Sequence, residues 1–291
     1  MKKIAILGCE NSHAATFLDF IFNNEKYKDI EVVGVYSNEP AASKALNEKF
    51  GVPVLENYTD ATGKIDGLII TARHGDLHYE YAKPYIESSI PMFIDKPVTI
   101  KEGDAIEMMK ALKDHGVRIC GGSSLKHDFG VKTLKSERES LVDGETLGGF
   151  VRAPLDSSSV YGGFFFYAPH LVEVVSEIYG KYPLSVEAKK NGKVTSVKFN
   201  YESYSVDGIF IDNNYVYYAC RFAEKSVKGM DLVSTDEHNW FKSEFDEFYA
   251  LLNGEESSVS YRDFISSVFV MNAIVRSLES GKEEKINTYE V

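Results

Sequence analysis

The sequence predicts an α/β protein in which a doubly wound parallel sheet is followed by an α+β domain with a mostly antiparallel, open sheet. Up to residue 122, short unbroken apolar runs alternate with amphipathic helical stretches, as in parallel strands covered by helices on both faces. Between residues 184 and 234 the apolar period falls to two, which is typical of half-buried strands. The chain has 291 residues, 44% of them apolar, which is enough for two cores.

Five buried strands alternating with helices predict a Rossmann fold for the first domain. The expected strands are residues 4–7, 31–36, 67–71, 91–94 and 117–120, and the expected later helices are residues 40–50, 78–87 and 103–115. The first helix is expected to carry Phe17, Ile21 and Phe22 on one face. Ligands of such sheets bind beyond the carboxyl ends of the strands. Function is therefore expected in the loops that begin at Gly8, Tyr36, Thr71, Ile94 and Cys120.

The pattern changes after Gly121-Gly122, so the expected domains are residues 1–122 and 123–291. The second domain is expected to begin with a strand at 148–154 and a helix at 168–179, followed by hairpins. Two helices are expected to close the chain, at residues 239–252 and 261–278.

Composition excludes several classes of function. The net charge is −12, which disfavours nucleic acid as a partner. The three cysteines are far apart and odd in number, so neither a disulfide framework nor a metal site is expected. The apolar run after Met1 is too short for a signal peptide, and no segment is long enough to span a bilayer. We therefore expect a soluble, cytoplasmic protein with no membrane partner.

The turn after the first strand reads Gly8-Cys9-Glu10-Asn11-Ser12-His13. A dinucleotide fingerprint would have glycine at 8, 10 and 13, and only Gly8 is present. One interpretation keeps a cofactor site here, in which the free N–H groups of residues 10–13 at the helix start bind an anion. The other is a tight strand–helix turn with Ser12 as the helix cap. The segment alone favours neither.

The acid that such a fingerprint expects after the second strand is also missing. Ser37 and Asn38 stand there instead, and either can hydrogen-bond a ribose hydroxyl. NAD or NADP fits this region. Because residues 39–44 are not strongly basic, NAD is favoured.

The third-strand and fourth-strand loops carry the most specific motif. Ile69-Ile70-Thr71 is followed by His78 and then by Ile94-Asp95-Lys96-Pro97-Val98. This arrangement resembles the glucose–fructose oxidoreductase / inositol dehydrogenase / MocA (Gfo/Idh/MocA) family, whose Glu-Lys-Pro motif has Asp95 here in place of glutamate. Residues 240–245 and 272–281 are similar to the family's last two helices. The resemblance covers nearly the whole chain, which is shorter than typical members, and the middle matches poorly.

The resemblance implies that Lys96 lies between nicotinamide and substrate and assists proton transfer at the substrate oxygen. Hydride leaves a carbinol carbon only as the O–H proton departs, and burial lowers the pKa of a lysine toward the useful range. A cis Lys96–Pro97 bond would fix the direction of the side chain. A surface lysine before a turn proline is the weaker alternative.

Thr71, His74, His78 and Asp95 are the other cofactor-binding candidates of these loops. His78 is expected either to contact the cofactor or to cap its helix. His74 lies in the loop between the two motifs, where it faces the pyrophosphate or is simply exposed.

In the second domain the family carries an Asp-x-Gly-x-His motif at the start of a helix. His170 matches the histidine, the usual acid/base of dehydrogenating members, whereas Phe166 and Ala168 stand at the aspartate and glycine positions. Tyr167 or Tyr161 is expected to replace the lost polar contact. Lys126 matches a region that lines the family's substrate pocket, and the substrate-binding candidates are Lys96, Lys126, Tyr167 and His170.

Together these residues predict an NAD(P)-dependent oxidoreductase that acts on a hydroxylated carbon of a small sugar, polyol or related compound. The resemblance also implies a homodimer or homotetramer formed through the C-terminal sheet. The departures at Glu10, His13 and Phe166 motivate an alternative, a non-catalytic relative that binds a dinucleotide or a sugar and acts through a protein partner.

Overall fold

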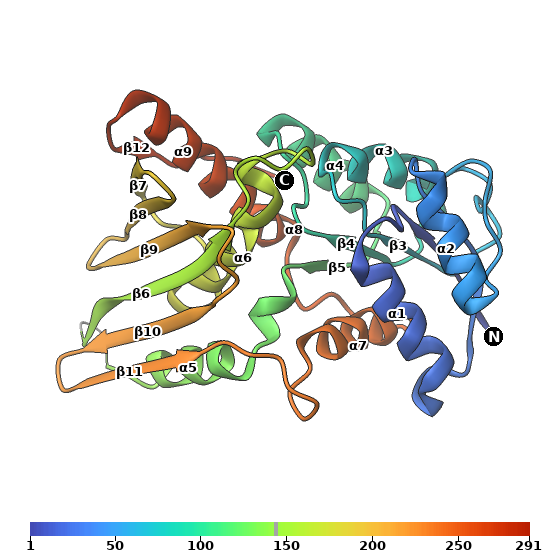
Figure 1. The fold of residues 1–291 in the computed structure, drawn as a ribbon, viewed down its shortest axis with the longest axis horizontal. Helices are drawn as coiled ribbons and strands as arrows, with labels where there is room; N and C mark the ends of the chain where they lie inside the picture. The colour runs from blue at the N-terminus through green and yellow to red at the C-terminus, as the bar shows by residue number, and fades with distance from the viewer. Residues whose placement is uncertain (143–144) are drawn as a thin grey trace. The chain divides into compact units, whose positions relative to one another are not determined.

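The computed structural model describes residues 1–142 and 145–291 (Figure 1). These residues form two compact units. The first contains residues 1–122, 241–264 and Val291, and the second contains residues 123–240 and 265–290.

The first unit is built on a five-stranded sheet in which all strands are parallel. Its strands are β1 (Lys2–Leu7), β2 (Ile30–Tyr36), β3 (Gly67–Ile70), β4 (Met92–Asp95) and β5 (Ile119–Gly122). The spatial order is β2-β1-β3-β4-β5, which confirms the predicted Rossmann-type sheet. The direction of winding reverses between β1 and β3, and ligands of such sheets bind at this reversal.

Helices pack on this sheet, and their apolar residues fill its core. They are α1 (Ser12–Asn23), α2 (Pro40–Phe50), α3 (Asp76–Ala82), α4 (Glu102–Asp114), α7 (Trp240–Leu252) and α8 (Tyr261–Phe264), with 3-10 turns η1 (Glu25–Tyr27) and η2 (Lys83–Ser88). Helix α1 buries Phe17 and Ile21, as expected. The expectation for Phe22 is wrong, because this side chain is 51% exposed. It lies one residue beyond the buried stripe and stacks on Phe50 of α2.

Helices α7 and α8 pack with the first unit, although the sequence-based division assigned them to the second domain. The ring of Phe245 lies 5.2 Å from that of Phe17 and 4.9 Å from that of Tyr27. Phe248 meets Phe93 of β4 edge-on. The apolar stripe of α7 therefore completes the Rossmann core.

The second unit has a seven-stranded sheet with the order β11-β10-β6-β9-β8-β7-β12. Its strands are β6 (Thr146–Leu155), β7 (Ser185–Asn191), β8 (Val194–Asn200), β9 (Ser205–Asp212), β10 (Tyr218–Ala223), β11 (Ser226–Asp231) and β12 (Glu284–Lys285). Only the β6–β9 pair is parallel among the described pairs of this sheet. This confirms the predicted mostly antiparallel sheet.

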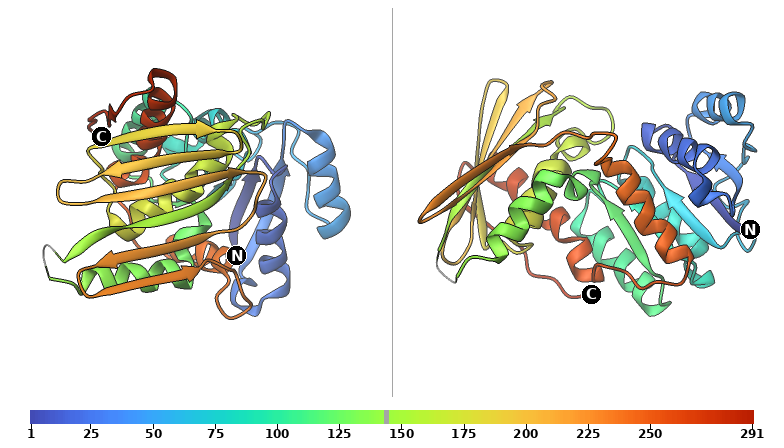
Figure 2. Two further views of the ribbon diagram at one scale, coloured as in Figure 1. Left: turned by 60° about the vertical axis from the view of Figure 1, so that its left-hand side comes forward. Right: turned by 90° about the horizontal axis from the view of Figure 1, so that it is seen from below.

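One face of this sheet is covered by helices, and Figure 2 (left) shows the other face turned toward the viewer with no helix over it. The helical elements are η3 (Ser124–His127), α5 (Phe129–Glu139), α6 (Phe164–Tyr179) and α9 (Ser266–Ser280). Val151, Phe199 and Phe210 point to the covered face and are almost fully buried. The sheet is therefore open on one side, as predicted.

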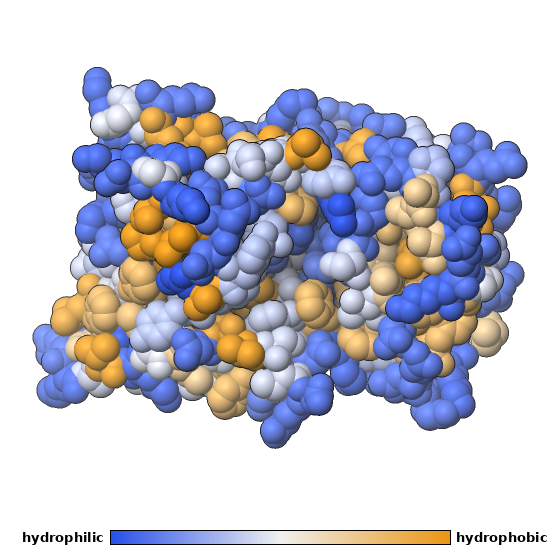
Figure 3. Space-filling view, viewed as in Figure 1, coloured by the Kyte–Doolittle hydropathy of each residue, from blue (hydrophilic) through white to orange (hydrophobic). Residues whose placement is uncertain are grey.

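The molecular face in Figure 3 is mostly hydrophilic, with apolar residues in small separate groups. Across residues 1–142 and 145–291, no helix is both long and apolar enough to cross a lipid bilayer.

Candidate active site

Gly8 ends β1 at the reversal of the winding, and its conformation admits only glycine. Its φ is +80°, and a Cβ atom there would lie 2.2 Å from the backbone nitrogen of Ala72. The Gly8 N–H donates to the Tyr36 carbonyl at 2.8 Å, and the Gly8 carbonyl accepts from Thr71 Oγ1 at 3.1 Å. The turn thus joins the ends of β1, β2 and β3.

A Gly8→Ala substitution is expected to lower the free energy of unfolding by about 2–4 kcal/mol, because it adds backbone strain and a clash with the β3 loop. Urea unfolding followed by circular dichroism measures this change. Gly103→Ala on α4 is the matched control. Its Cβ would meet nothing within 4 Å, so the same substitution there should not destabilise the fold. Equal urea midpoints for Gly8→Ala and Gly103→Ala would contradict the conclusion that position 8 requires glycine.

Glu10, which replaces the second fingerprint glycine, turns its carboxylate inward between two loops. Ser37 Oγ donates to Glu10 Oε2 at 2.6 Å, and the Arg73 N–H donates to Oε1 at 2.9 Å. Both Glu10 and Ser37 are buried. The carboxylate is therefore fixed beside the end of β2, where the sequence lacks an acid of its own.

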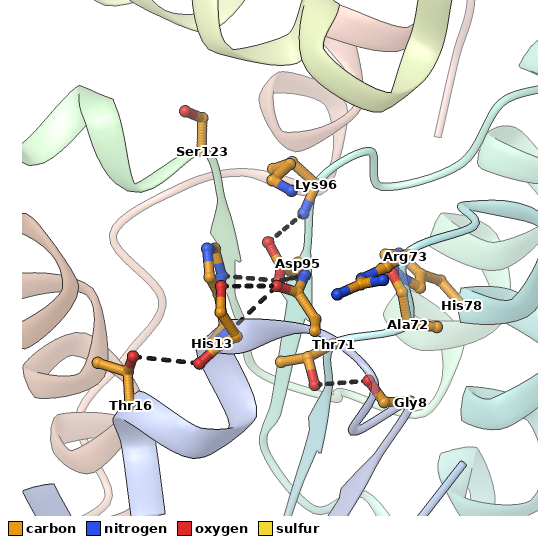
Figure 4. A network of polar contacts seen from close by, with 12 residues as sticks. Gly8, His13, Thr16, Thr71, Ala72, Arg73, His78, Asp95, Lys96 and Ser123 are labelled. Atoms are coloured by element: carbon orange, nitrogen blue, oxygen red, sulfur yellow. Dashed lines mark hydrogen bonds and ion pairs between the residues drawn. The ribbon is translucent and has the colours of Figure 1, made fainter. Parts of the chain in front are cut away.

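A second polar network surrounds Asp95 at the end of β4 (Figure 4). Asp95 Oδ2 lies 2.8 Å from His13 Nδ1 and accepts from Asn11 Nδ2 at 3.1 Å. Its Oδ1 accepts from the Lys96 N–H at 2.6 Å. Burial of this fully enclosed carboxyl would raise its pKa, but the charges of His13 and Lys96 outweigh that effect and hold the pKa of Asp95 below its usual range.

The His13 side chain, at the third fingerprint position, packs between Asp95 and Phe241. Its side chain is 7% exposed, and its ring meets that of Phe241 edge-on at 4.9 Å. Asn11, and not Ser12, is the N-cap of α1, since its side chain accepts from the His13 N–H. Ser12 is exposed as the first residue of the helix. The expectation of a Ser12 cap is therefore wrong.

The cofactor-binding candidates after β3 differ in their burial and contacts. His78 is fully buried, and its Nε2 lies 2.8 Å from the Ala72 carbonyl oxygen. Burial lowers the pKa of His78, so this ring is a neutral core group, and it neither caps α3 nor is open to a cofactor. His74 Nδ1 accepts from the Asp76 N–H at 3.3 Å. Thr71 is buried against Gly8, whereas Asn38 is exposed.

Lys96 follows β4 directly, and its bond to Pro97 is cis. The side chain is buried. In the first unit, the structure thus brings Glu10 to Ser37, Asn11 and His13 to Asp95, and Asp95 to Lys96. These residues lie at or just after the carboxyl ends of β1, β2 and β4.

In the second unit His170 lies on α6 and is 6% exposed. Its Nδ1 is 2.7 Å from Ser123 Oγ, and the rings of Tyr167 and Tyr217 lie 5.5 and 6.1 Å from its own. Phe166 packs edge-on against Tyr167. Lys126 lies half-buried in η3. The aromatic residues 164–167 form the first turn of α6.

Sequence reasoning missed Ser123 and Tyr217. The change of pattern after β5 marks the region of Ser123, but nothing in the sequence indicates its contact with His170. Among the described residues, no group of three or more His, Cys, Asp or Glu side chains is placed to hold a metal ion.

Residues 2–123 match the family model described as an oxidoreductase family with an NAD-binding Rossmann fold, GFO_IDH_MocA. The match covers less than half of the chain, and it shows that the first domain is similar to the NAD-binding Rossmann domain of these oxidoreductases.

Solved structures resemble the whole chain in fold. The scyllo-inositol dehydrogenase of Lactobacillus casei, solved with NAD(H) and scyllo-inositol, has a TM-score of 0.84 at 15% identity and covers 99% of this chain and 100% of its own. The myo-inositol dehydrogenase of Corynebacterium glutamicum has a TM-score of 0.80 at 15% identity, with coverage of 99% and 100%. At such identities the likeness shows the fold.

A curated relative, a candidate UDP-kanosamine synthase oxidoreductase subunit of Amycolatopsis mediterranei (strain S699), is 26% identical over 110 residues. The match spans 38% of this chain and only 30% of that protein.

Proposed function

We propose that this protein is an NAD(P)-dependent oxidoreductase that transfers hydride to or from a hydroxylated carbon of a small sugar, polyol or related compound. The observation that carries the proposal is the buried Lys96 at the end of β4, within a domain similar to the NAD-binding Rossmann domain of these oxidoreductases. The L. casei structure holds scyllo-inositol together with NAD(H), which supports a polyol-like substrate class.

The residues at the carboxyl ends of β1, β2 and β3 fit a dinucleotide. Hydroxyl and carboxylate groups of Ser37 and Glu10 suit the ribose, and the start of α1 suits an anionic group. NAD supplies the hydride acceptor when bound. Lys96 hydrogen-bonds the substrate oxygen and assists the transfer of its proton, so that the carbonyl forms as hydride leaves the carbon. Asp95 orients Lys96 through its backbone N–H.

Glu10 is expected to make NAD the preferred cofactor. Its carboxylate lies beside Ser37, so it repels the 2′-phosphate of NADP, as the acid after the second strand does in other dinucleotide-binding folds. Glu10→Gln keeps the shape and removes the charge. We expect the ratio of the NADP and NAD dissociation constants to fall by about tenfold, one charge–charge contact being worth about 1.4 kcal/mol. Calorimetric titration with both cofactors tests this, and an unchanged ratio would contradict it.

The activity is tested by incubating the protein with NAD and a panel of inositols, sugars and sugar alcohols, with reduced nicotinamide as the readout. We expect turnover with at least one member of the panel and none without the protein. Binding of NAD without turnover of any hydroxylated compound would argue for a non-catalytic relative, which no observation on the described residues favours.

The open face of the second-unit sheet supports self-association. The strand registers place Phe150, Ile209, Tyr218, Phe222 and Val227 on this face. We propose a homodimer or homotetramer formed through it, because an uncovered apolar sheet face is costly in water. Phe222→Glu is expected to shift the molar mass in light scattering toward the monomer. Val233→Glu, at an exposed position outside the sheet, is the control and should leave the mass unchanged.

A further inference from the structure

Ser123 makes two polar contacts with residues of α6. Its Oγ lies 2.7 Å from His170 Nδ1, and its N–H donates to Glu173 Oε2 at 2.8 Å. His170 and Glu173 are three residues apart on α6, so both contacts are made with one helix face. Ser123 is fully buried. The position of the imidazole is therefore set by a residue that directly follows β5.

The direction of the Ser123–His170 hydrogen bond follows from the other contact of the hydroxyl. Ser123 is the N-cap of η3, where its Oγ accepts from the Leu125 N–H at 3.3 Å. If it also accepted from His170 Nδ1, its own proton would be buried without an acceptor, which costs about 1–3 kcal/mol. If the Ser123 hydroxyl instead donates its proton to His170 Nδ1, it is a donor to His170 and an acceptor from Leu125 at the same time. His170 then carries its ring proton on Nε2.

We infer that Ser123 is a positioning residue that fixes His170 as a neutral imidazole with Nε2 as a hydrogen-bond donor. This inference rests on the proposed function for its role in catalysis. A neutral imidazole that donates from Nε2 polarises a substrate oxygen and does not accept its proton. His170 therefore takes up no proton in the proposed reaction, and its part is to bind the substrate oxygen.

The surroundings of His170 fit this assignment. Phe166, one turn before His170 on α6, has no polar side-chain group, and Ser123 supplies a polar partner from another element. The rings of Tyr167 and Tyr217 flank the imidazole. Burial raises the pKa of Tyr217 well above its usual value, so this neighbour stays neutral and brings no charge near the ring.

The tautomer is measured directly by ¹⁵N nuclear magnetic resonance of the histidine-labelled full chain without cofactor or substrate. The His170 signal is assigned as the one that is lost in His170→Gln. We expect Nδ1 unprotonated and Nε2 protonated in the wild type, and a mixture of tautomers in Ser123→Ala. Ser123→Thr, which keeps the hydroxyl, should restore the wild-type pattern. A protonated Nδ1 in the wild type would overturn the inference, whatever the activity of the protein.

The catalytic part is tested by turnover. Removing a donor of this kind lowers kcat by about 10²–10³, which is expected for His170→Ala. His170→Gln places an amide N–H near the Nε2 position and should stay within about tenfold of the wild type. Equal loss in both variants would show that His170 carries a proton and would overturn the role proposed for it. Urea midpoints verify that each variant is folded.

Discussion

Lys96→Ala is expected to lower kcat for hydride transfer by about 10²–10⁴-fold, which is the usual contribution of a positioned proton-transfer group. The structure supports this expectation because Lys96 is buried at the end of β4 and its backbone is held by Asp95. The dissociation constant for NAD should change little. Steady-state kinetics together with calorimetry separates the two effects.

Lys101→Ala is the matched control for this loss. Lys101 lies five residues further along the chain, its side chain is 66% exposed, and it pairs with the surface carboxylates of Asp76 and Asp104. Its removal should leave kcat unchanged, since exposed ion pairs contribute little. Equal losses in the two variants, or full activity of Lys96→Ala, would remove Lys96 from the mechanism.

His13→Ala is expected to cost about 3–5 kcal/mol of unfolding free energy, the usual result of removing one partner of a buried ion pair. Asp95 is fully buried, so its carboxylate would lose the nearest compensating side chain. Urea unfolding measures the loss. Combining His13→Ala with Asp95→Ala should recover part of it, because the carboxylate is then removed as well. Strictly additive losses would contradict a direct coupling.

The same pair predicts a dependence on pH. The pKa of Asp95 is lower in the folded chain than its usual value, so the unfolded chain binds the proton more readily. Its stabilising contribution is complete above the unfolded pKa of about 3.9 and is lost as the pH falls below it. In His13→Ala this loss should be smaller. Identical acid profiles of the two proteins would contradict the assigned shift.

The order of elements could be predicted because it depends on apolar period and on turn residues. The strands ending at Leu7, Tyr36, Ile70 and Asp95 were expected within one residue. The packing partner of α7 could not be predicted, because its apolar stripe does not indicate which sheet it covers. His78 shows the same limit, since its place near a helix start is visible in the sequence and its burial is not.

The site was predicted at the level of loops and not of contacts. The strand-end rule selects the loops that hold Glu10, His13, Ser37 and Asp95. The pairings of Ser37 with Glu10 and of His13 with Asp95 span 27 and 82 residues of sequence, and they depend on side-chain direction. The Ser123–His170 contact is of the same kind. Such pairings leave no periodic pattern that a single sequence could show.

Calorimetric titration of the folded protein with NAD(H) and NADP(H) tests most directly whether the altered glycine turn holds a dinucleotide. We expect saturable binding of NAD(H) with one site per chain and weaker binding of NADP(H). The contradicting result is no heat of binding and no rise in melting temperature with either cofactor, for a protein whose fold is verified by circular dichroism. Such a result would rule out dinucleotide-dependent hydride transfer by this protein.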